Sequence, residues 1–131
     1  MTEFKQETHA VKSGIGADQQ FGAVVPPIYL STNYTFAGFG EKRQYDYSRS
    51  GNPTRDTLAQ ALAALEGGAG AVITGSGMGA VNLVAEALLS SQDLLVAPHD
   101  CYGGSYRLFD SLAKRGCYRV LFVDQNDEQA L

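Results

Sequence analysis

"AVITGSGMGAVNLVAEALL", residues 71–89, joins a short apolar run to a longer one through a turn that contains three glycines. AVIT (71–74) has the length and composition of a buried β-strand, and GSGMG (75–79) predicts a turn. Six apolar residues then recur at helical spacing and predict the buried face of a helix: Met78, Val81, Val84, Ala85, Leu88 and Leu89. A strand, a turn and a helix in this order are typical of an α/β fold.

The same alternation continues downstream. LLVAP (94–98) predicts a strand, HDCYGGS (99–105) a polar loop, and YRVLFVD (118–124) another strand. Between that loop and the last strand, four apolar residues and a closing glycine predict a helix: Tyr106, Phe109, Leu112, Ala113 and Gly116. Nearly continuous apolar strands that alternate with helices are typical of a parallel sheet covered on both faces. We therefore expect a parallel βαβαβ arrangement, with ligands at the C-terminal ends of the strands.

A helix is also predicted upstream of the turn. Asn52 is a good N-cap, Pro53 suits the first helical position, and Gly67 with Gly68 ends the helix. Its expected buried face consists of Leu58, Ala61, Leu62 and Leu65. A further short helix is predicted at residues 6–13.

The first 53 residues otherwise predict an extended arm. VVPPIYLSTNYTF (24–36) mixes prolines with β-forming residues, and its apolar side chains need a surface to cover them. Because loops of this length are uncommon in compact domains, we expect the arm to lie on a partner subunit. An arm folded back on its own domain is the alternative.

The end of the chain predicts an interrupted fold. DQNDEQAL (124–131) leaves the last strand, offers Asn126 or Asp127 as an N-cap, and stops within the first helical turn. Three parallel strands would leave an open edge. We therefore expect residues 54–131 to be the first, truncated part of a larger domain.

Composition excludes several classes of protein. The chain has 131 residues, 44% of them hydrophobic, and a net charge of −4, which gives no basic footprint for nucleic acid. It contains no apolar run long enough to span a bilayer. Cys101 and Cys117 lack the spacing of a metal site, so we expect free thiols, no metal and a cytoplasmic location.

The glycine-rich turn predicts an anion site. A turn between a strand and a helix aims backbone N–H groups and the positive end of the helix dipole at an anion, and Ser76 can add a hydroxyl donor. A phosphate fits here, although glycines in such turns often serve tight packing alone. Tyr102, at the same edge of the sheet, can stack on a planar ligand, and Arg107 can hold a carboxylate by two hydrogen bonds. A surface tyrosine and a solvated arginine are the alternatives.

YDYSRSGNPT (45–54) offers a second set of donors to an anion. If the arm crosses to a partner, the Tyr47 hydroxyl and the Arg49 guanidinium can both donate to the partner's phosphate. The alternative is a surface ion pair between Arg49 and Asp46, which would contribute little.

Three segments together carry a resemblance to a known family. YSRSGNPTRDTL (47–58), LEGGAGAVITGSGMGAV (65–81) and PHDCYGGSYRLFDSLAKRGCYRVLFVD (98–124) resemble the N-terminal third of the pyridoxal-phosphate (PLP) enzymes of cysteine and methionine metabolism. The last segment is most similar to the branch that makes cystathionine. The resemblance implies PLP-dependent transferase fold type I, which is aspartate-aminotransferase-like. It also implies a homotetramer of tight dimers, with active sites shared between subunits.

The resemblance also implies roles for individual residues. Tyr47 and Arg49 would bind the phosphate of the neighbouring subunit's PLP, so the arm (1–53) would contribute to the dimer and to the neighbouring active site. Ser76 and the amides of Gly77 and Met78 would bind PLP within the subunit. Tyr102 would stack on the pyridine ring and assist proton transfer or departure of the leaving group. The substrate pocket would include Asp46 and Arg107.

The reaction implied is γ-replacement. An O-acylhomoserine, expected to be O-succinylhomoserine, exchanges its acyl group for cysteine sulfur and gives cystathionine in methionine biosynthesis (transsulfuration). Ser50 stands where a second arginine is common in this branch. This departure concerns the contact to the distal carboxylate of a succinylated substrate. None of the four lysines lies in the Ser-x-x-Lys context of the family's Schiff-base lysine, so the chain alone is expected to be inactive: Lys5, Lys12, Lys42 and Lys114.

Other functions remain open from the sequence. Within the family they are γ-lyases acting on cystathionine or methionine and O-acylhomoserine sulfhydrylases, and outside catalysis an interaction fragment. A distant rival is an NAD-binding Rossmann module, because Gly75, Gly77 and Ala80 have G-x-G-x-x-A spacing and Asp100 follows the next strand.

Overall fold

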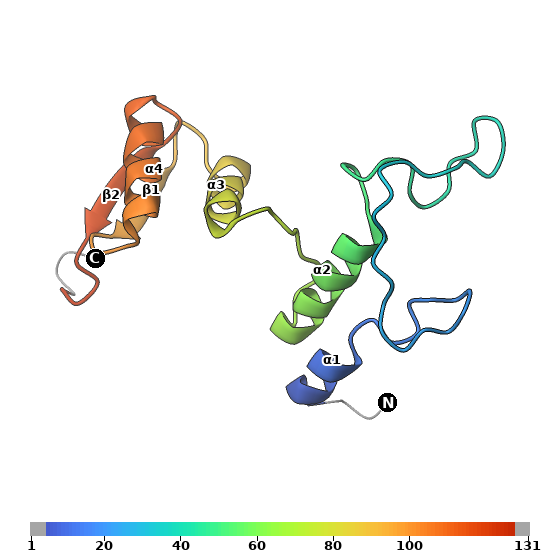
Figure 1. Ribbon diagram of the computed structural model, residues 1–131. Coiled ribbons are helices and arrows are strands. Elements are labelled where there is room, and N and C mark those ends of the chain that lie inside the picture. Colours follow the sequence, from blue (N-terminus) through green and yellow to red (C-terminus); the bar gives the residue numbers. More distant parts are fainter. Residues whose placement is uncertain (1–4, 128–131) are drawn as a thin grey trace. The chain divides into compact units, whose positions relative to one another are not determined.

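The computed structural model describes residues 5–127 and divides the chain into two compact units, with the boundary between Ile73 and Thr74. The first unit holds two helices and the second holds two helices and two strands (Figure 1): α1 (Gln6–Lys12), α2 (Pro53–Glu66), α3 (Gly77–Leu88), β1 (Leu94–Pro98), α4 (Gly103–Lys114) and β2 (Arg119–Val123). None of the helices within residues 5–127 combines the length and the apolar character needed to cross a bilayer.

Helix α2 begins and ends as its sequence predicts. The Asn52 side chain accepts hydrogen bonds from the N–H groups of Thr54 and Arg55, and Pro53 occupies the first helical position. Gly67 adopts the left-handed conformation (φ 64°) and donates its N–H to the Ala63 carbonyl. The left-handed backbone favours glycine, which explains why the helix stops there.

The first unit also contains α1 and the long irregular arm. Helix α1 falls within the predicted range of 6–13, and the Gln6 amide donates to the Leu65 carbonyl of α2 at 3.3 Å. Between α1 and α2 the backbone follows long loops (Figure 1) with two isolated bridges, of which one pairs Asn33 with Tyr47. The apolar side chains of the arm remain exposed, with 90% of Leu30 accessible. What covers them stays a prediction.

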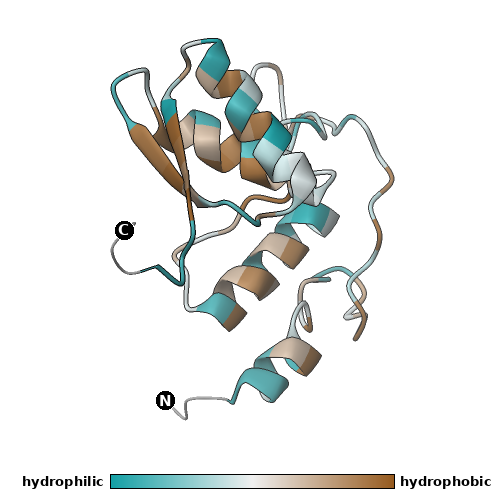
Figure 2. Ribbon diagram, turned by 90° about the vertical axis from the view of Figure 1, so that its left-hand side faces the viewer, coloured by the Kyte–Doolittle hydropathy of each residue, from teal (hydrophilic) through white to brown (hydrophobic). Residues whose placement is uncertain are grey.

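The second unit is built on a parallel pair of strands. β1 and β2 pair from Leu94 with Arg119 to Pro98 with Val123, and α4 connects them. Hydrophobic residues run along both strands (Figure 2). The core combines three buried residues with partly buried neighbours from α4, from both strands and from the residue that follows α3: Ala85, Leu112 and Tyr118, with Leu89, Leu95, Leu108, Phe109, Ala113 and Val120. Both predicted strands, 94–98 and 118–124, are therefore confirmed.

The predicted strand at 71–74 is wrong for this structure. Within the described residues no strand pairs with it, and the sheet has two strands instead of three. A strand needs hydrogen bonds from a neighbour, and an apolar run alone cannot supply them. The predicted loop 99–105 is also too long, because α4 already begins at Gly103. The helix expected after Asn126 falls mostly on residues 128–131, outside the described part of the chain.

The predicted buried faces of α2 and α3 are only partly correct. Leu58 and Leu62 of α2 and Val84 and Leu88 of α3 are exposed, whereas small residues are the buried ones, Ala63 in α2 and Ala85 in α3. Helical spacing identifies an apolar face but does not supply the surface that covers it.

Candidate functional site

The amino end of α3 is an open turn with unpaired backbone donors. Ser76 is the N-cap, and its hydroxyl oxygen accepts the N–H of Gly79 at 3.0 Å. The N–H groups of Gly77 and Met78 have no hydrogen-bond partner among residues 5–127. A Cβ placed on Gly77 would meet no atom within 4 Å, so no side chain plugs the turn. Two amides and the positive end of a helix dipole are available to an anion, and the Ser76 O–H can still donate.

Tyr102 comes to this turn from the next loop. It lies between β1 and α4, and 73% of its surface is exposed. A Cβ placed on Gly104 would lie 2.5 Å from Cε1 of Tyr102 and 3.1 Å from Sδ of Met78, so the ring and the thioether both approach Gly104. The Ser105 hydroxyl also donates to the Met78 sulfur at 3.9 Å. The first turn of α3 and the Tyr102 loop, which the sequence predicts to share one ligand, therefore meet at Gly104.

Arg107 lies on the exposed surface of α4, one turn from its start. Its Nη1 would lie 3.4 Å from a Cβ on Gly103, so the side chain folds back toward the amino end of the helix. That end follows Tyr102 directly. The guanidinium is thus directed toward the same edge of the second unit as the Tyr102 loop.

The first unit holds the second predicted group. The Arg49 guanidinium donates to the Tyr47 hydroxyl at 3.3 Å and stands 5.3 Å from the centre of the Tyr47 ring. Among the ion pairs of residues 5–127, the alternative pair between Arg49 and Asp46 is not found, and Asp46 instead pairs with Lys42 at 2.6 Å. Tyr47 and Arg49 therefore present a hydroxyl and a guanidinium side by side on an exposed segment.

Asp46 is held as a carboxylate within this segment. It accepts hydrogen bonds from Lys42, from the Ser50 hydroxyl at 3.1 Å and from the Tyr47 N–H at 2.8 Å. The Lys42 bond, followed by the Ser50 bond, lowers the pKa of Asp46 below its usual 3.8. Ser50 also donates to the Tyr47 carbonyl at 2.8 Å, so its hydroxyl is engaged inside the turn.

Arg55 is a residue of this segment that the sequence did not single out. From the first turn of α2 it donates to the Ser48 carbonyl at 2.9 Å and to the Arg49 carbonyl at 3.3 Å. One signal was available: a cation near the amino end of a helix opposes the helix dipole, so an arginine there indicates another role.

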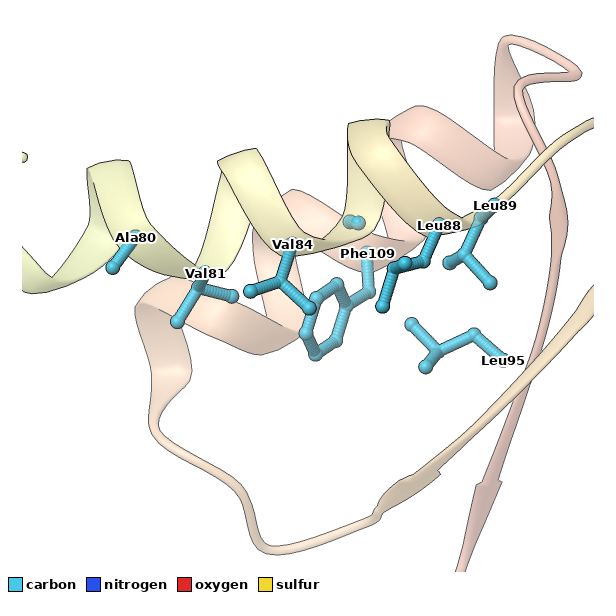
Figure 3. Close-up of a pocket in the computed structure, with 8 residues that line it drawn as sticks. Ala80, Val81, Val84, Leu88, Leu89, Leu95 and Phe109 are labelled. Atoms are coloured by element: carbon cyan, nitrogen blue, oxygen red, sulfur yellow. The ribbon is translucent and has the colours of Figure 1, made fainter. Parts of the chain in front are cut away.

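The second unit also contains an apolar cavity. It is an open hollow with a volume of about 410 Å³, lined by residues of α3, α4 and β1 (Figure 3). Its lining is apolar throughout and includes Val81, Val84, Leu88, Leu95 and Phe109. Its lining residues supply no acid, base or nucleophile.

The structure brings the predicted residues together in two groups, one in each unit. Asp46, Tyr47 and Arg49 belong to the first, and the turn at 76–78 with Tyr102 and Arg107 belongs to the second. The rival NAD module needs a strand directly before Gly75, and the structure has none there.

Comparisons with known proteins identify relatives of the chain. It is 70% identical over 127 residues to cystathionine γ-synthase of Escherichia coli (strain K12), covering 97% of this chain and 33% of that protein. It is 41% identical over 125 residues to the cystathionine γ-synthase/O-acetylhomoserine (thiol)-lyase of Bacillus subtilis (strain 168), covering 95% and 33%. The chain therefore spans about a third of the length of these curated relatives.

A solved structure confirms the predicted fold class. Cystathionine γ-synthase from Xanthomonas oryzae pv. oryzae, crystallised in complex with aminoacrylate and cysteine, matches with a TM-score of 0.94 and 57% identity, covering 98% of this chain and 33% of that one. The family model for Cys/Met metabolism PLP-dependent enzymes matches residues 7–131. The chain belongs to this PLP-dependent family.

Proposed function

We propose that this chain forms the N-terminal, cofactor-binding part of an enzyme that makes cystathionine from cysteine and an O-acylhomoserine, in methionine biosynthesis. The acyl donor we expect is O-succinylhomoserine. Within the structure, the observation that carries the proposal is the meeting of the open turn at Gly77 and Met78 with the Tyr102 loop around Gly104. The 70% identity to the E. coli relative supports the choice within the family.

The residues of the second unit fit PLP. This cofactor presents a phosphate and a flat aromatic ring. The second unit offers hydrogen-bond donors for the phosphate and an aromatic side chain for the ring. The Gly77 and Met78 amides with the Ser76 hydroxyl would hold the phosphate, and Tyr102 would stack on the pyridine. When bound, PLP supplies the electron sink that allows protons to leave the substrate's Cα and Cβ.

The residues of the first unit would act across a subunit interface. On this proposal residues 1–53 form an arm that contributes to a dimer, and residues 54–131 form the first part of the large PLP-binding domain. Tyr47 and Arg49 would donate to the phosphate held by the neighbouring subunit, since both are exposed donors on one segment. Two such dimers would make the homotetramer that the family resemblance implies.

The chain's own side chains would position the substrate and move a proton. Arg107 would hold a carboxylate of the substrate by two parallel hydrogen bonds. Asp46, whose pKa is lowered first by the Lys42 hydrogen bond, would remain an anion and accept from a substrate ammonium. The exposed Tyr102 hydroxyl would transfer a proton near the departing acyl group.

A second function is favoured by Ser50. Serine carries no positive charge that could pair with the distal carboxylate of a succinyl group. The Ser50 hydroxyl already donates to Asp46 and to the Tyr47 carbonyl. The B. subtilis relative carries both the synthase and the O-acetylhomoserine (thiol)-lyase names. An O-acetylhomoserine sulfhydrylase is therefore the alternative.

The function can be tested on an intact enzyme. We use the term holoenzyme for this chain joined to the remaining two thirds of the E. coli relative and loaded with PLP. We expect cystathionine to form from O-succinylhomoserine and cysteine, followed by mass spectrometry, and to require cysteine. Faster turnover of O-acetylhomoserine with sulfide would instead support the alternative. Saturable NADH binding without cystathionine formation would contradict both.

The isolated chain gives a second test. Lys42 and Lys114 form ion pairs with Asp46 and Asp110, and the Asp110 hydrogen bond raises the pKa of Lys114. A protonated amine is a poor nucleophile for a Schiff base. After incubation with PLP and borohydride reduction, we expect no lysine to be labelled stoichiometrically in peptide mass spectra. Stoichiometric labelling of a single lysine would overturn this expectation, and the holoenzyme is the positive control.

A further inference from the structure

The guanidinium of Arg55 fixes the backbone on both sides of Arg49. Its Nη1 donates to the carbonyl of Ser48 at 2.9 Å and its Nη2 to the carbonyl of Arg49 at 3.3 Å. These two carbonyls belong to the peptide planes that precede and follow the Arg49 Cα. Because the two planes determine φ and ψ of Arg49, they also set the direction in which its side chain leaves the backbone.

The position of Arg55 makes this role more specific. It lies in the first turn of α2, which the Asn52 cap fastens at its start. A cation there is opposed by the helix dipole, and the carbonyl bonds offset that cost. The flat, forked guanidinium suits two acceptors at once, whereas a lysine ammonium is a single point of charge.

The hydrogen bonds of the turn itself act in the same direction. The N–H groups of Ser50 and Gly51 donate to the Tyr47 carbonyl at 3.0 and 3.1 Å, which closes the turn around Arg49. Arg55 then joins this turn to the rigid helix. A site built on a regular element is held more accurately than a site on a free loop.

We infer that Arg55 is a positioning residue, which aims the Tyr47–Arg49 pair at the phosphate of PLP without touching the cofactor itself. This inference rests on the proposed function, in which Tyr47 and Arg49 bind that phosphate. It assigns to the helix α2 the task of holding the phosphate donors in place.

The test measures PLP affinity in the holoenzyme and its variants, by absorbance titration after PLP removal. We expect R55M to raise the Kd for PLP about tenfold, the size that one charge-assisted hydrogen bond contributes. R55K should give a smaller rise, because one ammonium can replace only part of the fork. The phosphorus NMR signal of bound PLP should shift in R55M toward its position in free PLP.

A matched control separates positioning from general stability. Arg119 also donates to a backbone carbonyl, that of Gln92, at 3.2 Å. It begins β2, at the strand end opposite to the edge that Tyr102 follows, because the pair is parallel. R119M should lower the melting temperature as R55M does, but leave the Kd for PLP and the phosphorus signal unchanged.

A double-mutant cycle with R49M gives the decisive outcome. If Arg55 acts through Arg49, R55M should raise the Kd less than twofold when R49M is already present. Two outcomes would refute this inference while leaving the proposed function standing. One is full additivity of R55M and R49M. The other is an unchanged Kd for PLP in R55M although R49M raises that Kd. If R49M itself leaves the Kd unchanged, the proposed phosphate role of Arg49 fails instead. If R55M does not fold, the Kd for PLP is compared between R55K and R119M instead. The inference then requires a raised Kd in R55K and an unchanged Kd in R119M.

Discussion

At Gly104 the absence of a side chain leaves room for the Tyr102 ring and the Met78 thioether. A Cβ there would stand 2.5 Å from the ring and 3.1 Å from the sulfur, both closer than side chains normally approach. The first turn of α4 therefore sets the orientation of the residue proposed to cover PLP. A side chain at position 104 would act by displacing the Tyr102 ring. This steric effect can be measured separately from the effect of the same side chain on the stability of α4.

We expect G104A in the holoenzyme to displace Tyr102 and to weaken PLP binding about tenfold, on the order of one lost aromatic contact. Alanine favours the helix by roughly 1 kcal/mol over glycine, so the melting temperature should not fall. The circular dichroism of bound PLP reports ring orientation. G103A is the matched control, since its Cβ would meet only the flexible tip of Arg107 at 3.4 Å. Equal spectra for G104A and G103A would contradict the expectation.

Tyr45 gives a prediction about pH. Burial, followed by the hydrogen bond that the Tyr45 phenol donates to the Asp56 carboxylate and by the charge of that carboxylate, raises the pKa of Tyr45 from 10.0 to about 12. A raised pKa means that the fold favours the neutral phenol. The resulting stability is fully present below pH 10.0 and is lost as the pH rises toward 12. D56N should move the titration of Tyr45 back toward 10.0, measured as the phenolate absorbance missing in Y45F; an unchanged midpoint in D56N would count against it.

The residues of the site were predictable to different degrees. The glycine-rich turn follows from its glycines directly ahead of an apolar helix, and Tyr102 follows from the polar loop after the strand at 94–98. The role of Tyr47 and Arg49 as phosphate donors was predicted from their side chains and from the family resemblance, and it remains a proposal. Arg55 was missed because its partners are backbone carbonyls, which no side-chain motif reveals.

At the scale of elements, caps were more informative than apolar runs. The Asn52 cap, Pro53 and Gly67 predicted both ends of α2, since their effects act within a few residues. The run at 71–74 was predicted as a strand and is not one, because pairing depends on a distant segment. Local signals thus predict where elements begin and end, whereas pairing and burial depend on the rest of the fold.

The Asn52 side chain joins α2 to the arm and can be tested as such. Its oxygen caps the helix, while its amide donates to the Tyr29 carbonyl and to the Tyr34 hydroxyl, both at 3.1 Å. We expect N52A in the holoenzyme to lower the free energy of unfolding by about 1–2 kcal/mol in urea titrations. N52D keeps the cap but loses the amide, so it should fall between N52A and the parent. If N52D and the parent are equal, the bonds to the arm contribute nothing.

At the scale of the whole molecule, large apolar side chains remain uncovered in both units. Val24, Val25 and Ile28 of the arm are at least 70% exposed, and Val84 and Leu88 border the apolar cavity of the second unit. Contiguous apolar surface of this kind marks an interface or a tendency to aggregate.

We therefore expect the isolated chain to self-associate and to bind the dye ANS, as seen by light scattering and fluorescence. The holoenzyme should show neither change at the same concentration, because the added portion and the partner subunits would cover these surfaces. A monodisperse monomer that leaves ANS fluorescence unchanged would show that the exposed side chains are tolerated in water.

The parallel pairing of β1 and β2 has a consequence during protein synthesis. Leu94 pairs with Arg119, twenty-five positions later, and α4 lies between them. A ribosome adds roughly 5–20 residues per second, so β1 waits on the order of seconds before its partner is made. During that interval the apolar residues of β1 are accessible to chaperones. The nascent chain can form the β1–β2 pair only after α4 and β2 have left the exit tunnel.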